Sequence, residues 1–462
     1  MPDRHDGVDD WLSRRIEPLA PPPGTFELIK RRARRRKFRK LAITASAAAA
    51  VVAAAVTVPQ VVNLPVLSPN PTSSVAGGQS AATPTASHRH STASAEASSA
   101  APILAPVPGN FRPTSVTFIG THTGWVIGQA LSPGHCATQF CTSVARTDDA
   151  GGTWAGVPAP LTGGPDGATG VSKIRFLNTH DGWAFGPQLF VTHAGGKTWA
   201  QVDTHGQRVT QLETVGDRVF AVFASCSGPG TAYAARCTGF TLYSSPASAQ
   251  DWAPVGPATT GLTSGAASEA ASLVLTGSRG YLLGPDGTLY AGPVDGSAAW
   301  QRVSSLVSPC TVGAAQADGQ PTGALLGAVN GGDLIVACAS GSSGGNLSVS
   351  RQQKLIYSSP NGGVSWIQMA KAPTAGVAYW LAAGPSGAVV LGTDQGIDVL
   401  PAGEIAWQAS SLTGSGPAGG FGYVGMTTDK QGIALPADPS SGTVWFTFDG
   451  GRSWKPSPLD GS

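Results

Sequence analysis

The sequence is poor in charged residues and lacks an extended helical pattern. Lys, Arg, Asp and Glu make up 12% of the 462 residues, whereas 62 residues are glycine and 36 are proline. This composition argues against a coiled coil or a long-helix protein and predicts a chain rich in turns. No helical period of useful length appears after residue 110, so we expect the main folded part to be all-β.

The net charge of +2 is the sum of a basic N-terminal part and a slightly acidic remainder. Residues 1–40 contain 12 Lys and Arg against 6 Asp and Glu, and residues 41–462 contain 17 against 21. The long part is therefore slightly acidic. Nucleic-acid binding depends on a basic face that neutralises many phosphates, so no nucleic-acid partner is predicted.

A basic run precedes an uncharged apolar stretch near the N-terminus. Nine of the eleven residues from Lys30 to Lys40 are basic, and residues 41–58 carry no charge. That length spans a bilayer core, and the cations keep the N-terminus inside the cell. We predict a cytoplasmic basic tail at residues 1–40 and a transmembrane signal anchor at 41–63. The protein would then be a single-pass cell-membrane protein with its main part outside. A signal peptide cleaved near Ala54 is the alternative.

Two segments flank the predicted anchor. Residues 11–29 contain apolar side chains around a proline-rich break, which suits either docking to a cytoplasmic partner or a disordered tail. Residues 64–110 consist mainly of Pro, Ser, Thr and Ala and are predicted to be a disordered linker. His88 and His90 in this linker do not make a closed metal site.

A short motif recurs through the rest of the chain: a hydroxyl residue, then Asp or Asn, Gly, and Ser or Thr followed by Trp. The full motif occurs at residues 147–154 and 447–454, with Asn replacing Asp at 359–366 and Ala replacing it at 192–199. Its tryptophans, together with those of degenerate copies, lie between 41 and 66 residues apart. They are Trp154, Trp199, Trp252, Trp300, Trp366, Trp407 and Trp454. Seven units of about 50 residues are therefore indicated.

Each unit also contains an apolar run with β propensity upstream of its tryptophan. These runs lie at residues 124–128, 182–186, 219–222, 280–284, 334–337, 388–392 and 432–435. Short strands joined by Gly-, Asn- and Asp-rich turns, with four strands expected in each unit, are typical of a β-propeller. We predict an all-β, seven-bladed β-propeller over residues 111–462.

The motif resembles the Asp-box or BNR repeat of sialidase-like propellers. With the preceding Gly-Trp strand, it is most similar to the photosystem II stability/assembly factor-like subgroup. The resemblance implies that the motif is a structural turn, not a calcium or catalytic site, and that its tryptophan packs between blades. The residues to which this role is assigned are Thr147, Asp149, Gly151, Trp154, Gly196, Trp199, Asn361, Gly363, Trp366, Asp449, Gly451 and Trp454.

The sialidase resemblance does not extend to a catalytic set. Sialidases use a tyrosine nucleophile with a glutamate, an aspartic acid and three arginines that bind the substrate carboxylate. Residues 111–113 match the family's Phe-Arg-Ile-Pro element only in part, and the folded region has just Glu213, Glu269 and Glu404 as glutamates. Sialidases also have six blades. We therefore predict no catalytic residue and no cofactor, and keep an exo-glycosidase as the alternative.

The cysteines form three pairs that are close in sequence. They are Cys136 with Cys141, Cys226 with Cys237, and Cys310 with Cys338. Outside the membrane, such cysteines are expected to form disulfides. Metal binding by His135 with the first pair would lack a fourth ligand, so no metal site is predicted.

The cysteine-bearing segments are longer than their counterparts in other units. The extra residues lie at 131–142, 225–239 and 339–353, between the second and third strands, and Cys310 lies in the connection into the fifth unit. All would decorate the face opposite the motif turns. Elaborated loops often bind ligands, although tolerated insertions pinned by disulfides would look the same. We predict a non-catalytic binding module for a protein or glycan outside the cell, with a sensor that signals through the tail as another alternative.

Overall fold

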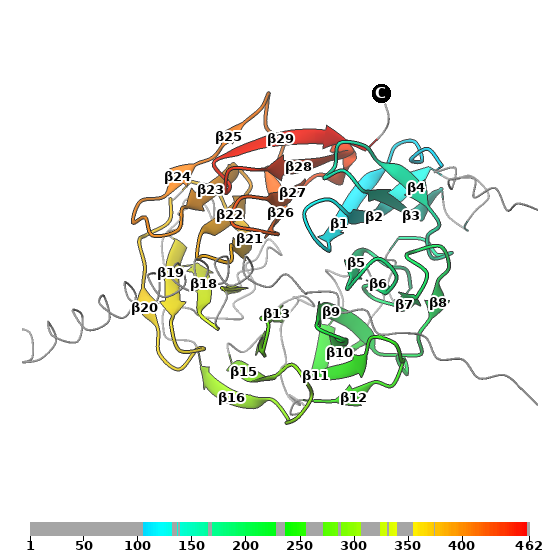
Figure 1. Cartoon of the computed structure of the whole chain (residues 1–462), viewed down its shortest axis with the longest axis horizontal. Helices are drawn as coiled ribbons and strands as arrows, with labels where there is room; N and C mark the ends of the chain where they lie inside the picture. The colour runs from blue at the N-terminus through cyan, green and yellow to red at the C-terminus, as the bar shows by residue number, and fades with distance from the viewer. Residues whose placement is uncertain are drawn as a thin grey trace, which may run out of the picture. The chain divides into compact units, whose positions relative to one another are not determined.

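Seven sheets, antiparallel apart from one added edge strand, follow one another around a ring, as Figure 1 shows. The computed structural model describes residues 105–131, 136, 139–164, 169–227, 236–255, 271–284, 288–305, 324–329, 332–339, 354–373 and 375–459. The chain divides into two units, Met1–Glu96 and Ala97–Ser462, and every described residue belongs to the second. The predicted seven-bladed β-propeller is confirmed.

Each sheet, or blade, is built from consecutive strands. Blade 1 contains β1 (Arg112–Phe118), β2 (Gly124–Leu131), β3 (Phe140–Thr147) and β4 (Ala155–Val157). Blade 2 contains β5 (Lys173–Phe176), β6 (Gly182–Phe185), β7 (Leu189–Thr192) and β8 (Ala200–Gln201). Blade 3 contains β9 (Arg208–Val215), β10 (Arg218–Ser227), β11 (Arg236–Pro246) and β12 (Ala253–Pro254). Blade 4 contains β13 (Ser272–Leu275), β14 (Arg279–Leu283), β15 (Thr288–Pro293) and β16 (Gln301–Ser305).

The remaining three blades continue the pattern. Blade 5 contains β17 (Leu325–Ala328), β18 (Leu334–Ala339), β19 (Lys354–Ser359) and β20 (Ile367–Gln368). Blade 6 contains β21 (Ala378–Ala383), β22 (Val389–Thr393), β23 (Gly396–Leu400) and β24 (Gln408–Ala409). Blade 7 contains β26 (Phe421–Met426), β27 (Gly432–Pro436), β28 (Thr443–Thr447) and β29 (Ser453–Pro458), with β25 (Ser411–Leu412) added beyond β29.

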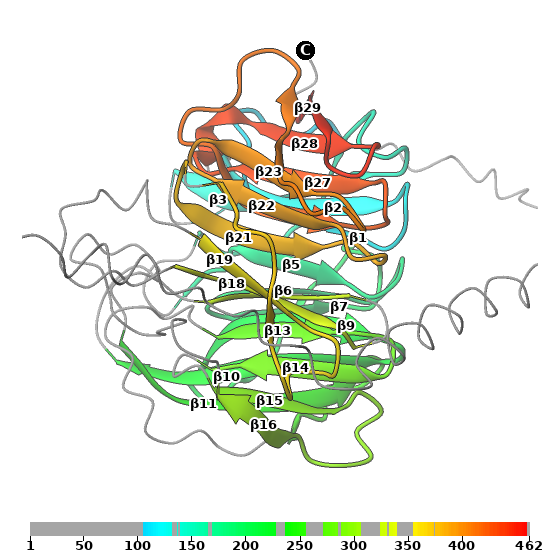
Figure 2. The ribbon, with the colours of Figure 1, turned by 90° about the vertical axis from the view of Figure 1, so that its left-hand side faces the viewer.

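The antiparallel order gives the ring two distinct faces. The strands run between these faces, as the side view in Figure 2 shows. The connections from second to third strand and from one blade to the next emerge on one face, which we call the insertion face. The motif turns, between third and fourth strands, emerge on the other, which we call the repeat-turn face. In every blade the first strand is innermost.

The core consists of seven apolar clusters, one at each contact between neighbouring blades. Alternating side chains of each second strand supply them: Trp183 of β6 packs toward blade 3, while Ala184 packs toward blade 1. Each motif tryptophan lies in the cluster between its own blade and the preceding one. In chain order these are Trp154, Trp199, Trp252, Trp300, Trp366, Trp407 and Trp454.

The ring closes between blades 7 and 1 through side chains. Phe111 and Val116 of the first blade pack against Ile433 and Phe446 of the last in one cluster. The Gln431 side-chain amide also donates a hydrogen bond to the carbonyl of Thr121, at 2.8 Å. Blade 1 is built from one continuous stretch of chain, so apolar burial instead of strand exchange holds this junction.

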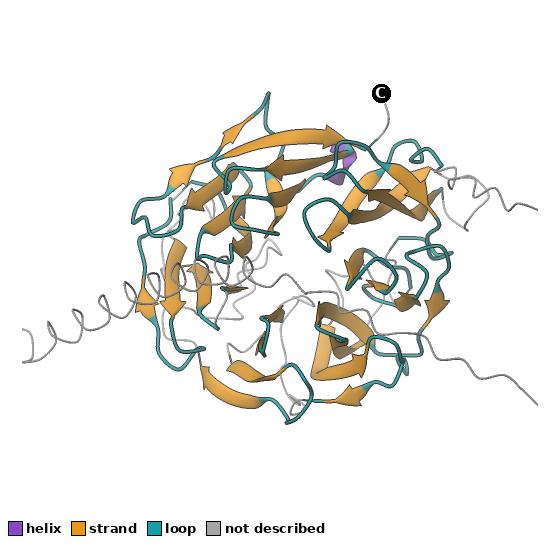
Figure 3. Cartoon of the chain, viewed as in Figure 1, coloured by secondary structure: helices purple, strands orange, loops and turns teal. Residues whose placement is uncertain are grey.

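Two features of the fold depart from the predicted four strands in each blade. Strand β25 pairs in parallel with β29 and makes blade 7 five-stranded, which the sequence did not predict. A 3-10 helix, η2 (Pro439–Ser441), lies between β27 and β28 (Figure 3). Among the described residues, no helix is long and apolar enough to cross a bilayer. The predicted anchor at 41–63 lies outside them.

Candidate functional site

The motif turns on the repeat-turn face bind their own backbone. In blade 1, Asp149 Oδ1 accepts hydrogen bonds from the Thr153 amide and from Thr147 Oγ1, each at 2.8 Å. Thr147 Oγ1 in turn accepts the Gly151 amide at 2.9 Å, and Gly151 has a φ of 85°, which glycine adopts without strain. Residues 447–453 of blade 7 repeat this network. The aspartates are thus occupied within the turn.

Asparagine carries out the same role in blade 5. The Asn361 Oδ1 atom accepts the Ser365 amide at 2.9 Å, and its Nδ2 donates to Ser365 Oγ at 2.8 Å. In blade 2, where Ala194 occupies this position, Thr192 Oγ1 still accepts the Gly196 amide at 3.0 Å. The hydroxyl-to-glycine bond is therefore common to all four turns, whereas the carboxylate is not.

Replacing Asp149 with alanine is expected to destabilise the propeller by about 1 kcal/mol, because the exposed turn loses several hydrogen bonds. Asp149→Asn should cost less than Asp149→Ala, because an amide oxygen can accept the same bonds, as that of Asn361 does. Burial raises the pKa of Asp149, but hydrogen bonds from Thr153 and Thr147 outweigh it and leave the pKa below 3.8. The ionised form is thus favoured by folding.

The pH dependence of unfolding separates these variants. The carboxylate of Asp149 contributes stability above about pH 4, and this contribution is lost as the pH falls through its lowered folded pKa. Urea unfolding at pH 7 and near pH 3 should therefore show a smaller difference between wild type and Asp149→Ala in acid. An equal difference at both values would contradict a role for the ionised carboxylate.

Two disulfides lie on the insertion-face side of blades 1 and 3. Cys136 and Cys141 are joined at the start of β3, and Cys226 is joined to Cys237 between β10 and β11. Both pairings were expected. Cys338 on β18 is also disulfide-bonded, and its predicted partner, Cys310, lies outside the described residues.

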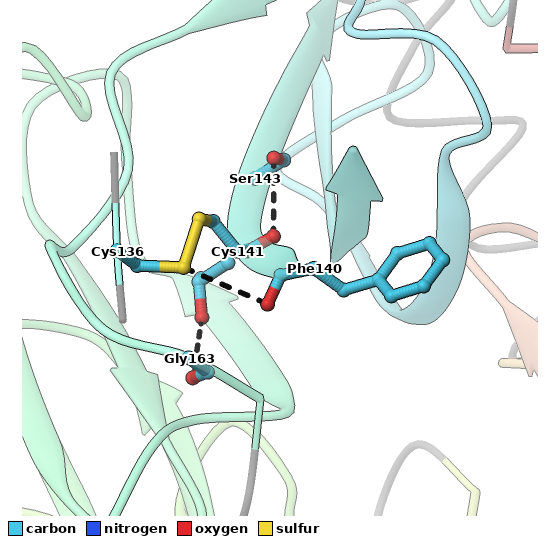
Figure 4. Close-up of a disulfide and its surroundings, with 6 residues drawn as sticks. Cys136, Phe140, Cys141, Ser143 and Gly163 are labelled. Atoms are coloured by element: carbon cyan, nitrogen blue, oxygen red, sulfur yellow. Dashed lines mark hydrogen bonds between the residues drawn. A yellow bond between two sulfur atoms is a disulfide. The ribbon is translucent and has the colours of Figure 1, made fainter. Parts of the chain in front are cut away.

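The surroundings of the first disulfide show how it holds the chain together. Cys141 forms an isolated antiparallel bridge to Gly163, which belongs to the connection into blade 2. Thr142 Oγ1 donates to the Gly163 carbonyl at 2.8 Å, and Ser143 Oγ donates to the Cys141 carbonyl (Figure 4). The disulfide therefore fixes a strand end that also anchors the next blade connection.

The second disulfide joins the two longest strands that the structure describes. Strands β10 and β11 contain 10 and 11 residues, and Cys226 lies opposite Cys237 in their register. The corresponding strands of blade 2, β6 and β7, contain 4 residues each. Blade 3 is therefore extended on the insertion face and covalently closed there.

A separate polar cluster lies among the innermost strands. Residues 173–176 read Lys-Ile-Arg-Phe, and the two apolar members pack into the contact with blade 1. Because side chains alternate along a strand, Lys173 and Arg175 lie on the other side. Arg175 Nη2 forms a 2.6 Å ion pair with Glu213 Oε1 of β9, and Lys173 Nζ donates to the Thr210 carbonyl at 3.1 Å.

Tyr423 of blade 7 completes this cluster, because its hydroxyl interacts with Arg175. Tyr423 of β26 packs against Trp380 of β21, with ring centroids 5.1 Å apart. Burial raises the pKa of the Tyr423 hydroxyl, and the positive charge of Arg175 opposes the shift. Burial likewise raises the pKa of Glu213 against the effect of Arg175. We call Arg175, Glu213 and Tyr423 the channel trio.

The channel trio contains one residue of each of three types found in a sialidase site. A further cation, Lys173, also acts on Glu213. Arg112, from the partial family element, instead lies 4.2 Å from the ring centroid of Phe140. The trio was not predicted from the sequence, and Glu269 and His135 lie outside the described residues.

No protein-family model and no curated protein matches the chain. A solved structure described as YCF48 bound to D1 peptide is 15% identical, with a TM-score of 0.44, over 76% of this chain and 93% of that one. YCF48 from Cyanidioschyzon merolae is 15% identical, with a TM-score of 0.43, over 66% and 88%. An ancestral GH74 enzyme is 15% identical, with a TM-score of 0.46, over 77% of this chain and 47% of the enzyme. These neighbours include the photosystem II assembly factor type of propeller that the motif resembles.

Proposed function

We propose that the propeller is a non-catalytic recognition module that binds a protein or glycan outside the cytoplasm. The observation that carries this proposal is the elaboration of one face. The two disulfides between described cysteines stiffen connections on the insertion face, and the hairpin of β10 and β11 extends there. Stiffened loops on a rigid scaffold bind with a smaller loss of conformational entropy.

We also propose the membrane topology that the sequence predicts. A helix at residues 41–63 would anchor the chain in the cell membrane, and the linker at 64–110 would hold the propeller away from it. The tail at residues 1–40 would lie in the cytoplasm, where it is available to a second partner. The charge difference between the tail and the rest of the chain supports this orientation.

An exo-glycosidase is the second candidate, and the channel trio is the observation that favours it. A tyrosine, a glutamate and an arginine lie together, as they do in a retaining sialidase site. Against it, the ion pair with Glu213 already occupies part of the Arg175 guanidinium. Recognition without turnover therefore fits the described contacts better.

Charge-reversal variants on the two faces provide the test. Asp203 and Lys371 are exposed in blade connections on the insertion face, whereas Lys197 and Asp251 are exposed on the repeat-turn face. Asp203→Lys combined with Lys371→Glu is expected to weaken binding of the full-length protein to cell-envelope preparations by about tenfold, which is about 1.4 kcal/mol. Neither pair of changes alters the net charge. Sedimentation with increasing amounts of envelope measures the affinity.

The matched control is Lys197→Glu combined with Asp251→Lys, which should leave binding unchanged. Equal weakening by both double variants would place the contact elsewhere or make it nonspecific. The same preparations are assayed with fluorogenic sialosides and related glycosides. Turnover that is lost in Tyr423→Phe would overturn the recognition proposal in favour of the enzyme.

A further inference from the structure

A pocket lies on blade 1 where the described chain enters the propeller. Its volume is about 320 Å³, which is in the range of pockets that hold small ligands or side chains. One wall is formed by Pro108 of the entering chain, and another by Cys141 and the start of β3. The third wall is the chain that leaves β4, at residues 157–162.

The pocket favours an apolar occupant. Proline residues and aliphatic side chains supply most of its wall, among them Pro158, Pro160 and Leu161. Two of its hydroxyl groups, those of Thr142 and Ser143, already donate to backbone carbonyls. Leu161 is 87% exposed at its edge. A side chain that covered Leu161 would therefore bury apolar surface without displacing a hydrogen bond.

The direction in which the chain enters blade 1 indicates which residues lie beside the pocket. Ala105 forms an antiparallel bridge with Gly156 of β4, and the Gly156 amide donates to its carbonyl at 2.7 Å. In an antiparallel pair, residues before Ala105 run beside residues after Gly156. Those later residues line the pocket. The two residues immediately before Ala105 are Ile103 and Leu104.

Bulky apolar side chains are rare in the part of the linker between Leu67 and Ala105. Across residues 68–104, the bulky apolar side chains are Val75, Ile103 and Leu104, and the rest are mainly small or polar. On the other side of the bridge, Val107 and Phe111 already pack in the cluster between blades 7 and 1. The entering chain is thus fixed on its downstream side by the same kind of apolar contact.

We propose that Ile103 and Leu104 occupy this pocket, so that the last residues of the linker form a strap along the outer edge of blade 1. Pro158 has no N–H group, so regular strand pairing cannot extend past Val157. Side-chain burial instead of a continued hydrogen-bond ladder would hold the strap. The linker would then leave the propeller from a fixed point on blade 1.

Limited proteolysis of the full-length protein in detergent micelles tests the strap. The probe is proteinase K, and the start of the resistant core is read from its mass. In the wild type, bonds at residues 102–104 should be cut at least about tenfold more slowly than bonds at 95–100, because docked chain is protected. In Ile103→Asp combined with Leu104→Asp, the core should begin at Ala105 or later. Val66→Asp combined with Leu67→Asp adds the same charge elsewhere in the linker and should leave the protection unchanged.

The substitutions at residues 103 and 104 also change the bonds that the protease cuts. A variant in the wall of the pocket controls for this effect. Leu161→Asp leaves the linker sequence intact, and it changes no buried side chain because Leu161 is exposed. The variant should therefore fold like the wild type, and near-ultraviolet circular dichroism checks this. It should abolish the protection of residues 102–104. Wild-type cleavage there at the rate of residues 95–100, or protection that survives Leu161→Asp, would overturn the proposal. Protection that disappears on dilution would also overturn it, because the occupant would then be a second copy.

Discussion

Replacing Trp454 with alanine is expected to destabilise the propeller by about 3–5 kcal/mol. The side chain is completely buried between blades 6 and 7, and its Nε1 atom donates to the Gly451 carbonyl at 3.1 Å. The substitution removes a large apolar side chain and leaves a cavity in the buried cluster that also contains Val390 and Val399. Guanidinium unfolding followed by tryptophan fluorescence and circular dichroism measures the loss.

The matched control occupies the same motif position in blade 5. Trp366 is only partly buried in the contact between blades 4 and 5, and its Nε1 has no hydrogen-bond partner. Trp366→Ala should therefore cost less, about 1–2 kcal/mol, because less buried apolar area is lost. Equal losses at both positions would mean that burial between blades does not determine what each tryptophan contributes.

The number and order of the blades could be predicted because their signals are local. Each second strand is a short apolar run beside a glycine turn, and the predicted run at residues 280–284 overlaps β14, just as the run at 432–435 lies within β27. The spacing of the tryptophans then gives the count. Strand pairing within a blade joins segments adjacent in sequence, so few alternatives compete.

The parts of the fold that were missed depend on contacts without a local pattern. Strand β25 has two residues, Ser411 and Leu412, and pairs with β29 about forty residues later. The bridge from Ala105 to Gly156 likewise joins the end of a low-complexity linker to a blade edge. Neither segment has the length or alternation that identifies a strand from sequence.

One part of the candidate site could likewise be predicted from the sequence, and another part could not. The pairing of Cys226 with Cys237 could be predicted because the two lie 11 residues apart at the ends of paired strands. The channel trio could not, because Arg175, Glu213 and Tyr423 come from blades 2, 3 and 7 and meet only when the ring closes. The sequence around Arg175 offered only one signal, namely a charged residue between the apolar residues Ile174 and Phe176. That alternation indicates a strand with one polar side, but it does not indicate which residues face Arg175.

Replacing Arg175 with methionine is expected to destabilise the propeller by about 1–3 kcal/mol at pH 7, because Glu213 would lose its partner at 2.6 Å. The two side chains are 23% and 29% exposed, so the cost lies below that of a fully buried pair. The double variant Arg175→Met with Glu213→Gln should recover much of the loss, since it removes the unpaired charge. Urea unfolding of the wild type, both single variants and the double variant measures the coupling.

The stability deficit of Arg175→Met should also depend on pH. Burial raises the pKa of Glu213, and Arg175 opposes that shift, so the pKa should rise further in Arg175→Met. A carboxyl whose folded pKa is raised destabilises the fold once the pH exceeds its unfolded value, near 4.5, and does so increasingly up to the folded pKa. The deficit of Arg175→Met relative to wild type should thus be largest at pH 7 and shrink toward pH 4.5. The deficit of the variant that also carries Glu213→Gln should not grow with pH, because its side chain at that position does not ionise. A deficit independent of pH would mean that Arg175 acts through packing of its aliphatic stem, and not through the charge it places beside Glu213.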